Sequence, residues 1–525
     1  MLKGLNLFVF RIAFIFCCSP LLADAVKNEY LIKFKPQIST ANFYQLGQAL
    51  RSFDNFPLLH HRKLSDLEVR NFVSLASDQI EYIEPVYKVS YIKFQAEKKF
   101  SYSGKSDFKN QWALENSKDT DVNILEAWKH TKGHPNIVVA VIDTGVDYRH
   151  KDLKNQIWKN PGEIPNNGID DDGNGYIDDV HGWNFHGDTL DPLDDNGHGT
   201  HCSGIIAAQG LKAWGAAPRV KIMSLKFLSA RGSGSTADAI SAIDYAITMK
   251  ANVLSNSWGG GDYSKALEDT FLLAKDKNII VVTAAGNSGQ DISERPMYPA
   301  ALNLDNMLTV ANINESGKLH LSSNYSKDLV HLAAPGTRIF STYLDNNYAS
   351  LTGTSMAAPY VSAAAAMLYS RHENISYQAV KQILMNNVKR LASLVKTNKS
   401  NGSLDIGAAL KSSLGEPPSP PSPPAPPPRE GVSFKPELVK IEKNVSKKWY
   451  RVHYRVKLAL TSAQENLDMI KKVSYYYRRG LTSSRVITST SHGNSFSVGL
   501  KTKYPKQIFK IEITDSQGKV HLIYR

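Results

Sequence analysis

Short apolar runs rich in valine and isoleucine recur through the middle of the chain, at Ile137–Ile142, Val220–Leu225 and Ile279–Val282. Runs of this length and composition predict strands that are buried on both faces. Between the last two, Thr236–Lys250 repeats isoleucine at helical spacing, and Thr236 can cap such a helix. Strands that alternate with helices predict an α/β fold with a doubly wound, mostly parallel sheet.

A different pattern precedes this region. Glu29–Phe34 and Ile83–Val89 alternate apolar and polar residues and predict two strands, whereas Ala41–Phe53 has a helical pattern. We therefore expect a small α+β module ahead of the α/β domain.

The end of the chain returns to alternation. Trp449–Leu458, Val473–Tyr477 and Ile508–Ile513, with glycine and serine between them, predict a small β-sandwich. The run Pro417–Pro428 separates it from the α/β domain and contains nine prolines among twelve residues. Because such a run cannot form the interior of a helix or a sheet, it predicts an extended linker.

Charge distinguishes this last module from the rest. The 525-residue chain has a formal net charge of +13, and residues 429–525 carry 20 Lys and Arg against 7 Asp and Glu, so the module holds the whole excess. Such a surface can bind an anionic cell-surface polymer. A solvated basic surface over cross-strand aromatic residues is the alternative, and no motif of a nucleic-acid reader is present.

The first residues have the pattern of a secretory signal. An apolar run, Leu5–Cys18, leads to Ala23-Asp24-Ala25, an Ala-x-Ala site at which cleavage is expected after Ala25. A membrane anchor is the alternative, but the run is short and contains Arg11. We expect secretion to the extracellular space or the cell envelope. Cys202 is then the single cysteine, so the exported chain has no internal disulfide.

Three motifs far apart in the chain, DTGVD, HGTHCSG and GTSMAAP, contain Asp143, His198 and Ser355. A serine hydroxyl becomes a nucleophile when a base lies within hydrogen-bond reach and a third group orients that base. Asp143 would lie at the carboxyl end of a strand, where open α/β sheets place their sites, and Ser355 would open an Ala-rich helix. The amide of Asn287, which follows another strand, can donate to an oxyanion.

Together with SWGG and AAGNSG, these motifs have the order and spacing of the subtilase family of serine peptidases, which residues 107–414 resemble. The resemblance implies an orienting acid at Asp143, a general base at His198, a nucleophile at Ser355 and an oxyanion donor at Asn287. The implied substrate-binding residues are Ser257, Trp258, Gly259, Gly260, Ala284, Ala285 and Gly286. Substrate would join the SWGG segment as an added strand, and Trp258 with its glycines suggests an open pocket for apolar or aromatic side chains.

The module before the α/β domain resembles the inhibitory propeptide of subtilases, in which the last strand leads into the cleft. It could assist folding of the parallel sheet, whose non-local contacts form slowly. We expect processing between Ile92 and Lys105, with a persistent N-terminal domain as the alternative. The expected divisions are a signal peptide at 1–25, an inhibitor propeptide at 26–98, a peptidase domain at 105–414, a linker at 416–429 and a basic β-rich domain at 430–525.

A metal site is also indicated. Residues 170–179, DDDGNGYIDD, match the first half of an EF-hand calcium loop, but His181 stands where the bidentate glutamate belongs. We therefore expect a structural calcium site that is built differently, with a solvated turn as the alternative. The candidate ligands are Asp152, Asp170, Asp172, Asn174, Tyr176, Asp178 and Asp179, of which Asp152 is implied by the resemblance. Without disulfides, calcium binding would stabilise the folded state.

The overall expectation is a secreted, self-processed serine endopeptidase. It would act as a monomer on proteins or peptides with broad specificity, be inhibited by its own propeptide and use no catalytic cofactor. A secreted binding protein in which the peptidase domain is a scaffold is the alternative. An aspartic peptidase would need a second Asp-Thr-Gly or Asp-Ser-Gly motif, and a zinc role for His201 would need the HExxH glutamate; the sequence has neither.

Overall fold

The computed structural model describes residues 25–35, 48–53, 55–65, 67–69, 80–92, 94–100 and 111–414, together with the backbone of seven strands between residues 439 and 524. The chain divides into two compact units between Pro421 and Ser422, and each is described by itself. The predicted signal-peptide residues before Ala25 and the whole of the proline-rich linker lie outside the described residues.

A nine-stranded sheet forms the centre of the first unit, in the order β17-β18-β14-β13-β12-β10-β6-β8-β7. Its paired strands are parallel except for β17 and β18. The bounds are β6 Val138–Asp143, β7 Gly182–Asn184, β8 Lys221–Lys226, β10 Val253–Asn256, β12 Ile280–Ala284, β13 Met307–Ile313, β14 Leu332–Pro335, β17 Val388–Arg390 and β18 Gly402–Leu404. The predicted α/β fold with a mostly parallel sheet is confirmed.

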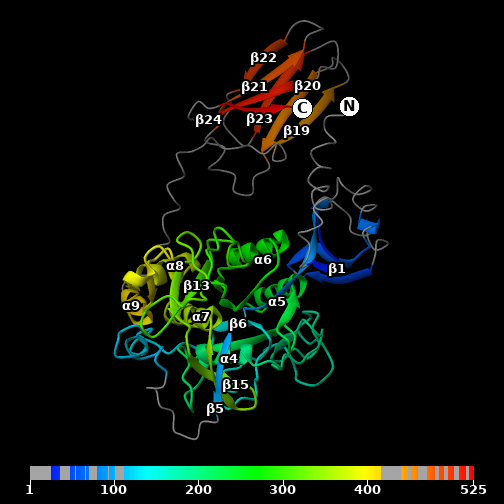
Figure 1. Cartoon of the computed structure of the whole chain (residues 1–525). Coiled ribbons are helices and arrows are strands. Elements are labelled where there is room, and N and C mark those ends of the chain that lie inside the picture. The colour runs from blue at the N-terminus through cyan, green and yellow to red at the C-terminus, as the bar shows by residue number, and fades with distance from the viewer. Residues whose placement is uncertain are drawn as a thin grey trace. The chain divides into compact units, whose positions relative to one another are not determined.

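Helices cover both faces of this sheet (Figure 1). Their bounds are α3 Ile124–Trp128, α4 His198–Ala207, α5 Thr236–Thr248, α6 Lys265–Asp276, α7 Thr354–Arg371, α8 Tyr377–Asn386 and α9 Ile406–Ser412, with a 3₁₀ turn at Ala392–Leu394. Alternate residues of β6 enter two different cores. Val139 and Val141 pack with α4 and α7, whereas Ala140 and Ile142 pack with α5 and α6. This double burial explains why β6 is apolar throughout.

The predicted cap of α5 is wrong by one residue. The side chain of Ser235 accepts from the backbone N–H of Asp238 at 3.1 Å, which satisfies one of the open donors of the first turn. Thr236 is the first helical residue, and its hydroxyl instead accepts from the N–H of Tyr87 at 3.0 Å.

The N-terminal module is a sheet in which β1 (Ala25–Phe34) lies between β3 (Phe56–Lys63) and β4 (Ile80–Tyr91), with β2 (Gln48–Phe53) beyond β3. The two predicted strands are confirmed. The helix predicted at Ala41–Phe53 is wrong over its second part, because Gln48–Phe53 forms β2 and pairs with β3. Tertiary pairing overrides a helical pattern of this length. The first part of that segment lies outside the described residues.

Four further strands lie outside the central sheet. They are β5 Gln95–Phe100, β9 Ser233–Ser235, β15 Ile339–Tyr343 and β16 Asn347–Thr352, and a two-residue strand, β11, spans Trp258–Gly259. The second unit contains two antiparallel sheets, β19-β20-β23 and β22-β21-β24-β25. Their bounds are β19 Val439–Ser446, β20 Arg451–Leu458, β21 Ile470–Arg478, β22 Ser484–Ser489, β23 Ser495–Lys501, β24 Ile508–Asp515 and β25 Val520–Tyr524.

Candidate active site

The site begins where β6 ends and α4 begins. Nδ1 of His198 lies 2.8 Å from Oδ1 of Asp143, and both side chains are fully buried. The two elements can approach this closely because residue 199 is glycine, since a Cβ there would lie 2.1 Å from the carbonyl oxygen of Gly145. The other ring nitrogen of His198, Nε2, is buried and has no hydrogen-bond partner among the described residues.

A buried carboxylate fixes the loop that leads to His198. Asp194 accepts from the hydroxyls of Thr144 at 2.8 Å and Thr200 at 2.6 Å, and from the N–H of Gly197 at 3.0 Å. Burial raises the pKa of Asp194. Since Thr144 follows Asp143 and Thr200 is in the first turn of α4, Asp194 links the elements that carry the predicted acid and base.

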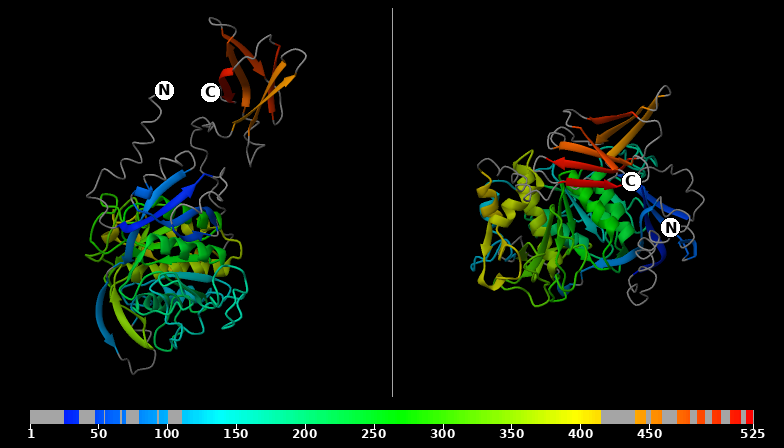
Figure 2. Two further views of the ribbon diagram at one scale, coloured as in Figure 1. Left: turned by 90° about the vertical axis from the view of Figure 1, so that its right-hand side faces the viewer. Right: turned by 90° about the horizontal axis from the view of Figure 1, so that it is seen from above.

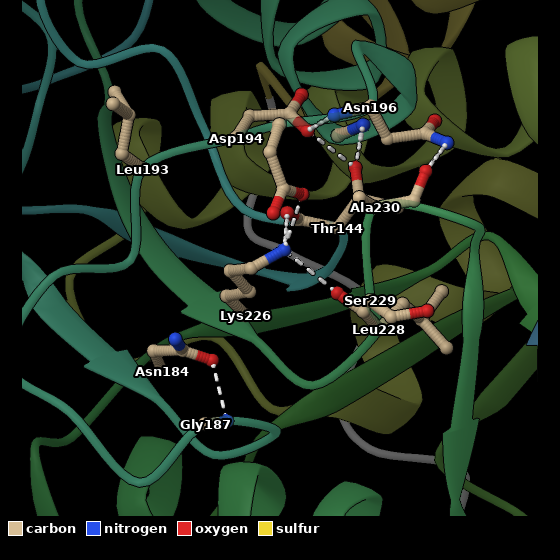
Figure 3. A network of polar contacts seen from close by, with 12 residues as sticks. Thr144, Asn184, Gly187, Leu193, Asp194, Asn196, Lys226, Leu228, Ser229 and Ala230 are labelled. Carbon is tan, nitrogen blue, oxygen red and sulfur yellow. Dashed lines mark hydrogen bonds and ion pairs between the residues drawn. The ribbon is translucent and has the colours of Figure 1, made fainter.

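Lys226, the last residue of β8, makes a second link (Figure 3). Its buried ammonium donates to the carbonyl oxygens of Thr144 and Leu228, both at 2.8 Å, and to Asp195 at 2.7 Å. Leu228 leads toward β9, so one cation joins the end of β6 to the segment before β9. This role of Lys226 was not predicted, because a lysine at a strand end gives no local signal of two buried carbonyl acceptors and a neighbouring carboxylate.

Ser355 lies in the first turn of α7 and is fully buried. Its hydroxyl donates to the carbonyl oxygen of Ser257 at 3.2 Å rather than to His198. Because Pro359 has no N–H for the carbonyl four residues earlier, the carbonyl of Ser355 accepts instead from the hydroxyl of Ser257 at 3.1 Å and the thiol of Cys202 at 3.4 Å. The proline thus allows α4 and the segment at Ser257 to bond to the start of α7.

Asn287 lies beside the same turn. Its Oδ1 accepts from the backbone N–H of Thr354 at 2.9 Å and from the Thr354 hydroxyl at 3.1 Å. Its Nδ2 lies on the side of Gly353, where an added Cβ would be only 2.7 Å away. The preceding predicted residues Ala284 and Ala285 are buried, and Gly286 donates its N–H to the Thr354 hydroxyl at 3.1 Å. The amide donor is therefore held next to the start of α7.

The end of β4 passes between β9 and β11 as an inserted strand. Ser90 lies opposite Gly259 on one side and opposite Ser233 on the other. The N–H of Tyr91 donates to the carbonyl of Gly232 at 2.9 Å, and the N–H of Ile92 donates to the carbonyl of Ser257 at 3.4 Å. The carbonyl of Ser257 also accepts from the Ser355 hydroxyl, so the backbone of Ile92 lies next to the predicted nucleophile.

Trp258 takes part in this pairing through its backbone. Its side chain is fully buried, 4.9 Å between ring centroids from Phe227, and its indole N–H donates to Asn256 at 3.2 Å. The expectation that Trp258 opens an apolar pocket is therefore wrong, because the side chain belongs to the core between the sheet and α5. Gly260 continues the segment with φ of 123°, and its N–H donates to the carbonyl of Tyr298 at 3.0 Å.

His201 and Cys202, which follow His198 in α4, make buried contacts with the protein around the site. His201 places Nε2 3.0 Å from the carbonyl oxygen of Ile339 and 3.1 Å from that of Ala349, and burial lowers its pKa to about 3. Among the described residues, His201 belongs to no group of three potential metal ligands. Cys202 is buried, as expected, and burial raises the pKa of its thiol.

The candidate calcium loop brings together two of the predicted carboxylates, Asp172 and Asp179, with one that was not predicted, Glu163. Glu163, Asp172 and Asp179 each place an oxygen within 4.8 Å of the others. Asp170 instead accepts from the N–H groups of Gly173, Asn174 and Gly175, and Asp178 accepts from those of Asn167 and Gly168. Asp152 accepts from the N–H groups of residues 211–213 and from the Tyr348 hydroxyl, and belongs to no such cluster among the described residues.

This cluster suits a hard cation. It offers only oxygen ligands, as calcium prefers, and burial raises the pKa of Glu163 and of Asp179, with like charges adding to the effect. Three carboxylates this close repel one another unless a cation or protons compensate them. Glu163 was missed because it lies seven residues before the acidic loop, outside the spacing that the EF-hand pattern covers.

A parallel sheet that brings an aspartate, a histidine and a serine to one edge defines the class of α/β serine hydrolases. The subtilase family model matches residues 134–406, just over half of the chain. The chain belongs to the subtilase family of serine peptidases.

Two relatives illustrate the match. Subtilisin-like protease 1 of Plasmodium vivax is 37% identical over 289 residues, covering 51% of this chain and 46% of the relative. Thermophilic serine proteinase of Bacillus sp. (strain AK1) is 36% identical over 251 residues, covering 47% of this chain and 56% of the relative. The chain thus spans about half the length of the curated relatives it matches.

A solved structure agrees in fold. Fervidolysin from Fervidobacterium pennivorans, described as a keratinolytic enzyme related to subtilisin, matches with a TM-score of 0.61 at 21% identity, covering 90% of this chain and 69% of that chain. Among the described residues of this chain, none of the helices has the length and apolar character that crossing a membrane requires.

Proposed function

We propose that the protein is a secreted serine endopeptidase that processes its own precursor. Ser355 is the nucleophile, His198 the general base, Asp143 the acid that orients it, and Asn287 an oxyanion donor. The observation that carries the proposal is the buried 2.8 Å contact between Nδ1 of His198 and Asp143. It leaves Nε2 of His198, near the turn that holds Ser355, with no hydrogen-bond partner among the described residues.

The reaction follows from these positions. The hydroxyl of Ser355 attacks the carbonyl carbon of the bound peptide while Nε2 of His198 takes its proton. The resulting oxyanion accepts from Nδ2 of Asn287 and from the N–H of Ser355. His198 then protonates the leaving amine, and a water molecule repeats the sequence on the ester to release the acid and restore Ser355.

The bond that is cut in the precursor is Ile92–Lys93. Ile92 is the residue whose N–H donates to Ser257, and it is 6% exposed, packed in the core cluster that includes Met356. This position refines the expected interval from Ile92 to Lys105 to its first bond. Ile92 immediately precedes the proposed cut, and the buried Val89 lies three residues earlier. Both support the proposed preference for apolar residues within a broad specificity.

The N-terminal module acts as an inhibitor until it is released. Besides the inserted strand, Glu84 accepts from the Ser264 hydroxyl at 2.6 Å and from the N–H groups of Lys265 and Ala266 at 2.8 and 3.2 Å, so it caps α6 of the peptidase domain. Lys33 forms an ion pair with Asp269 at 2.8 Å. These contacts hold the module against the domain that its last strand blocks.

Three further parts of the proposal concern stability and location. Calcium binds at Glu163, Asp172 and Asp179 and stabilises a fold that has no disulfide. The signal sequence directs the protein to the extracellular space or cell envelope, and the basic second unit attaches it to an anionic surface polymer. Protein substrates and the propeptide are its partners, and it acts as a monomer.

The test uses the full chain and its Ser355→Ala variant. The wild type should release a fragment that begins at Lys93, label at Ser355 with a fluorophosphonate and hydrolyse casein, and the variant should remain intact and unlabelled. A wild-type chain that neither labels nor processes, while folded by circular dichroism, would refute the proposal and favour a scaffold.

A further inference from the structure

The strand β5 continues the chain beyond the proposed cut. It pairs antiparallel with β16, placing Gln95 opposite Thr352 and Ala96 opposite Leu351, and the pairing extends to Phe100 opposite Tyr348. β16 lies between β5 and β15 in one three-stranded sheet, whose strands can be followed in Figures 1 and 2. The residues that follow the cut bond of a substrate are called its primed side. Counted from Lys93 as the first, Gln95 to Phe100 are the third to eighth residues of this side.

We propose that β16 is a docking strand for six residues of the primed side of a substrate, so that the protein prefers extended polypeptides with at least eight residues after the cut. This inference rests on the proposed peptidase function. The substrate would add to β16 by the same backbone pairing that β5 makes, a mode in which main-chain hydrogen bonds supply affinity.

The chain's own strand has to leave before a substrate can be cut. The ring of Phe94 stacks on His198, with centroids 5.3 Å apart and 22° between the planes, so it covers the proposed base. β5 starts at the next residue. In the proposed sequence of events β5 leaves β16 together with Phe94, and β16 then becomes the edge of a two-stranded hairpin with β15.

The sequence of β16 lacks the residues that usually prevent an edge strand from pairing with another strand. Natural edge strands are commonly protected by proline or by charged side chains. β16 reads NYASLT and has neither. An edge without these features is open to another strand.

The docking strand is also held in a fixed position relative to His198. His201, in the first turn of α4, contacts the carbonyl oxygens of Ile339 in β15 and Ala349 in β16. The hydroxyls of Ser341 and Thr342 donate to the carbonyls of His201 and Thr200, both at 2.8 Å. Because α4 begins at His198, a strand that joins β16 enters the site in a defined register, and little ordering remains to be done on binding.

The experiment is a ladder of fluorogenic peptides cut by the mature wild-type protein. All share one sequence before the cut and carry two, four, six, eight or ten residues after it. We expect kcat/KM to rise by at least about tenfold between two and eight residues and then to level off, because each backbone bond contributes modestly. A control series of peptides that is lengthened before the cut, beyond the fourth residue on that side, should show no such rise in kcat/KM.

Backbone N-methylation of the eight-residue substrate identifies the cause. The third to fifth residues pair with β16 before the register shift between Ala349 and Ser350. Within them, a methyl group should lower kcat/KM toward the value of the two-residue substrate at the positions of one alternate set, whereas at the intervening position it should leave kcat/KM unchanged. A flat ladder, or equal effects at all positions, would overturn the docking strand although the peptides are still cut. If no peptide is cut and no serine labels, the proposed function itself fails.

Discussion

The ring of Tyr91 stacks on the imidazole of His198, with centroids 5.1 Å apart and 21° between the planes. Phe94 stacks on the same imidazole from three residues further along the chain. The segment around Ile92 therefore covers the proposed base with aromatic rings on both sides of the bond proposed to be cut. Under the proposed function, one strand would both block the site and present the peptide bond that is cut.

Asn287→Asp isolates the oxyanion donor. In the wild type, the side-chain oxygen of Asn287 accepts hydrogen bonds from the N–H and the hydroxyl of Thr354. Aspartate keeps an oxygen that can accept both, but it removes the Nδ2 donor. We expect kcat to fall by about 10²–10³-fold, the loss found for one such donor in subtilisin, with KM changed by less than about threefold. Steady-state kinetics on a peptide substrate measure this. A fall of kcat below about fivefold would exclude Asn287 from the oxyanion site.

Lys226→Met should weaken substrate binding and stability together. Methionine leaves the carbonyls of Thr144 and Leu228 buried without their donor, which costs about 1–3 kcal/mol for a buried polar group. We expect a lower melting temperature and a KM raised several-fold, because Leu228 leads to β9. Asp195→Asn is the control, since it leaves both carbonyl contacts in place and Asp195 is half exposed. Equal effects of the two variants would contradict the role of Lys226.

Glu84→Ala in the separately added N-terminal module should weaken inhibition of the mature domain by about tenfold or more. The substitution removes three hydrogen bonds to the first turn of α6, and bonds to an ionised carboxylate are the stronger kind. Glu81→Gln is the matched control, because Glu81 makes a 3.5 Å ion pair with Lys33 and is 43% exposed. Equal inhibition constants for the Glu84→Ala and Glu81→Gln modules would argue against a contribution of the Glu84 cap on α6 to inhibition.

Calcium removal should destabilise the protein through Glu163 and Asp179. In the inactive Ser355→Ala background, calcium at a hundredfold its dissociation constant should add about 2.7 kcal/mol to the free energy of unfolding. A chelator should abolish this gain, and Asp179→Asn should reduce it strongly. Asp276→Asn, at the exposed end of α6, should keep the full response. A melting temperature that is independent of calcium in the parent chain would contradict the site.

The buried imidazole of His201 should make the free energy of unfolding depend on pH. Burial lowers its folded pKa from 6.5 to about 3, so below about pH 6.5 the unfolded chain binds a proton at this position that the folded chain does not. This group should therefore reduce the free energy of unfolding by about 1.4 kcal/mol per pH unit as the pH falls from 6.5 toward 3. His201→Asn, in the same Ser355→Ala background, should lack this component. Denaturant titrations across this range compare the two chains, and parallel pH profiles would show that the imidazole is not buried neutral.

Local patterns were sufficient where the deciding contacts are close in sequence. The apolar runs at β6, β8 and β12 and the Ala-rich helix α7 were predicted within a few residues of their observed bounds, because double burial leaves a local signal. The second part of Ala41–Phe53 was mistaken for a helix because its pairing with β3 has no local signature. The indole of Trp258 was misplaced for a related reason, since a strand residue can face either side of a sheet.

The sequence by itself determined the family and the identities of Asp143, His198, Ser355 and Asn287, because each lies in a short motif whose order along the chain is informative. Only the tertiary structure decided that Ile92 lies beside Ser355, that Glu163 joins Asp172 and Asp179, and that Asp194 and Lys226 fix the ends of β6 and α4. The contacts behind these findings join residues that are seven to 165 positions apart in the chain. Their partners are chosen by how the sheet and helices pack, and no spacing along the chain encodes that choice.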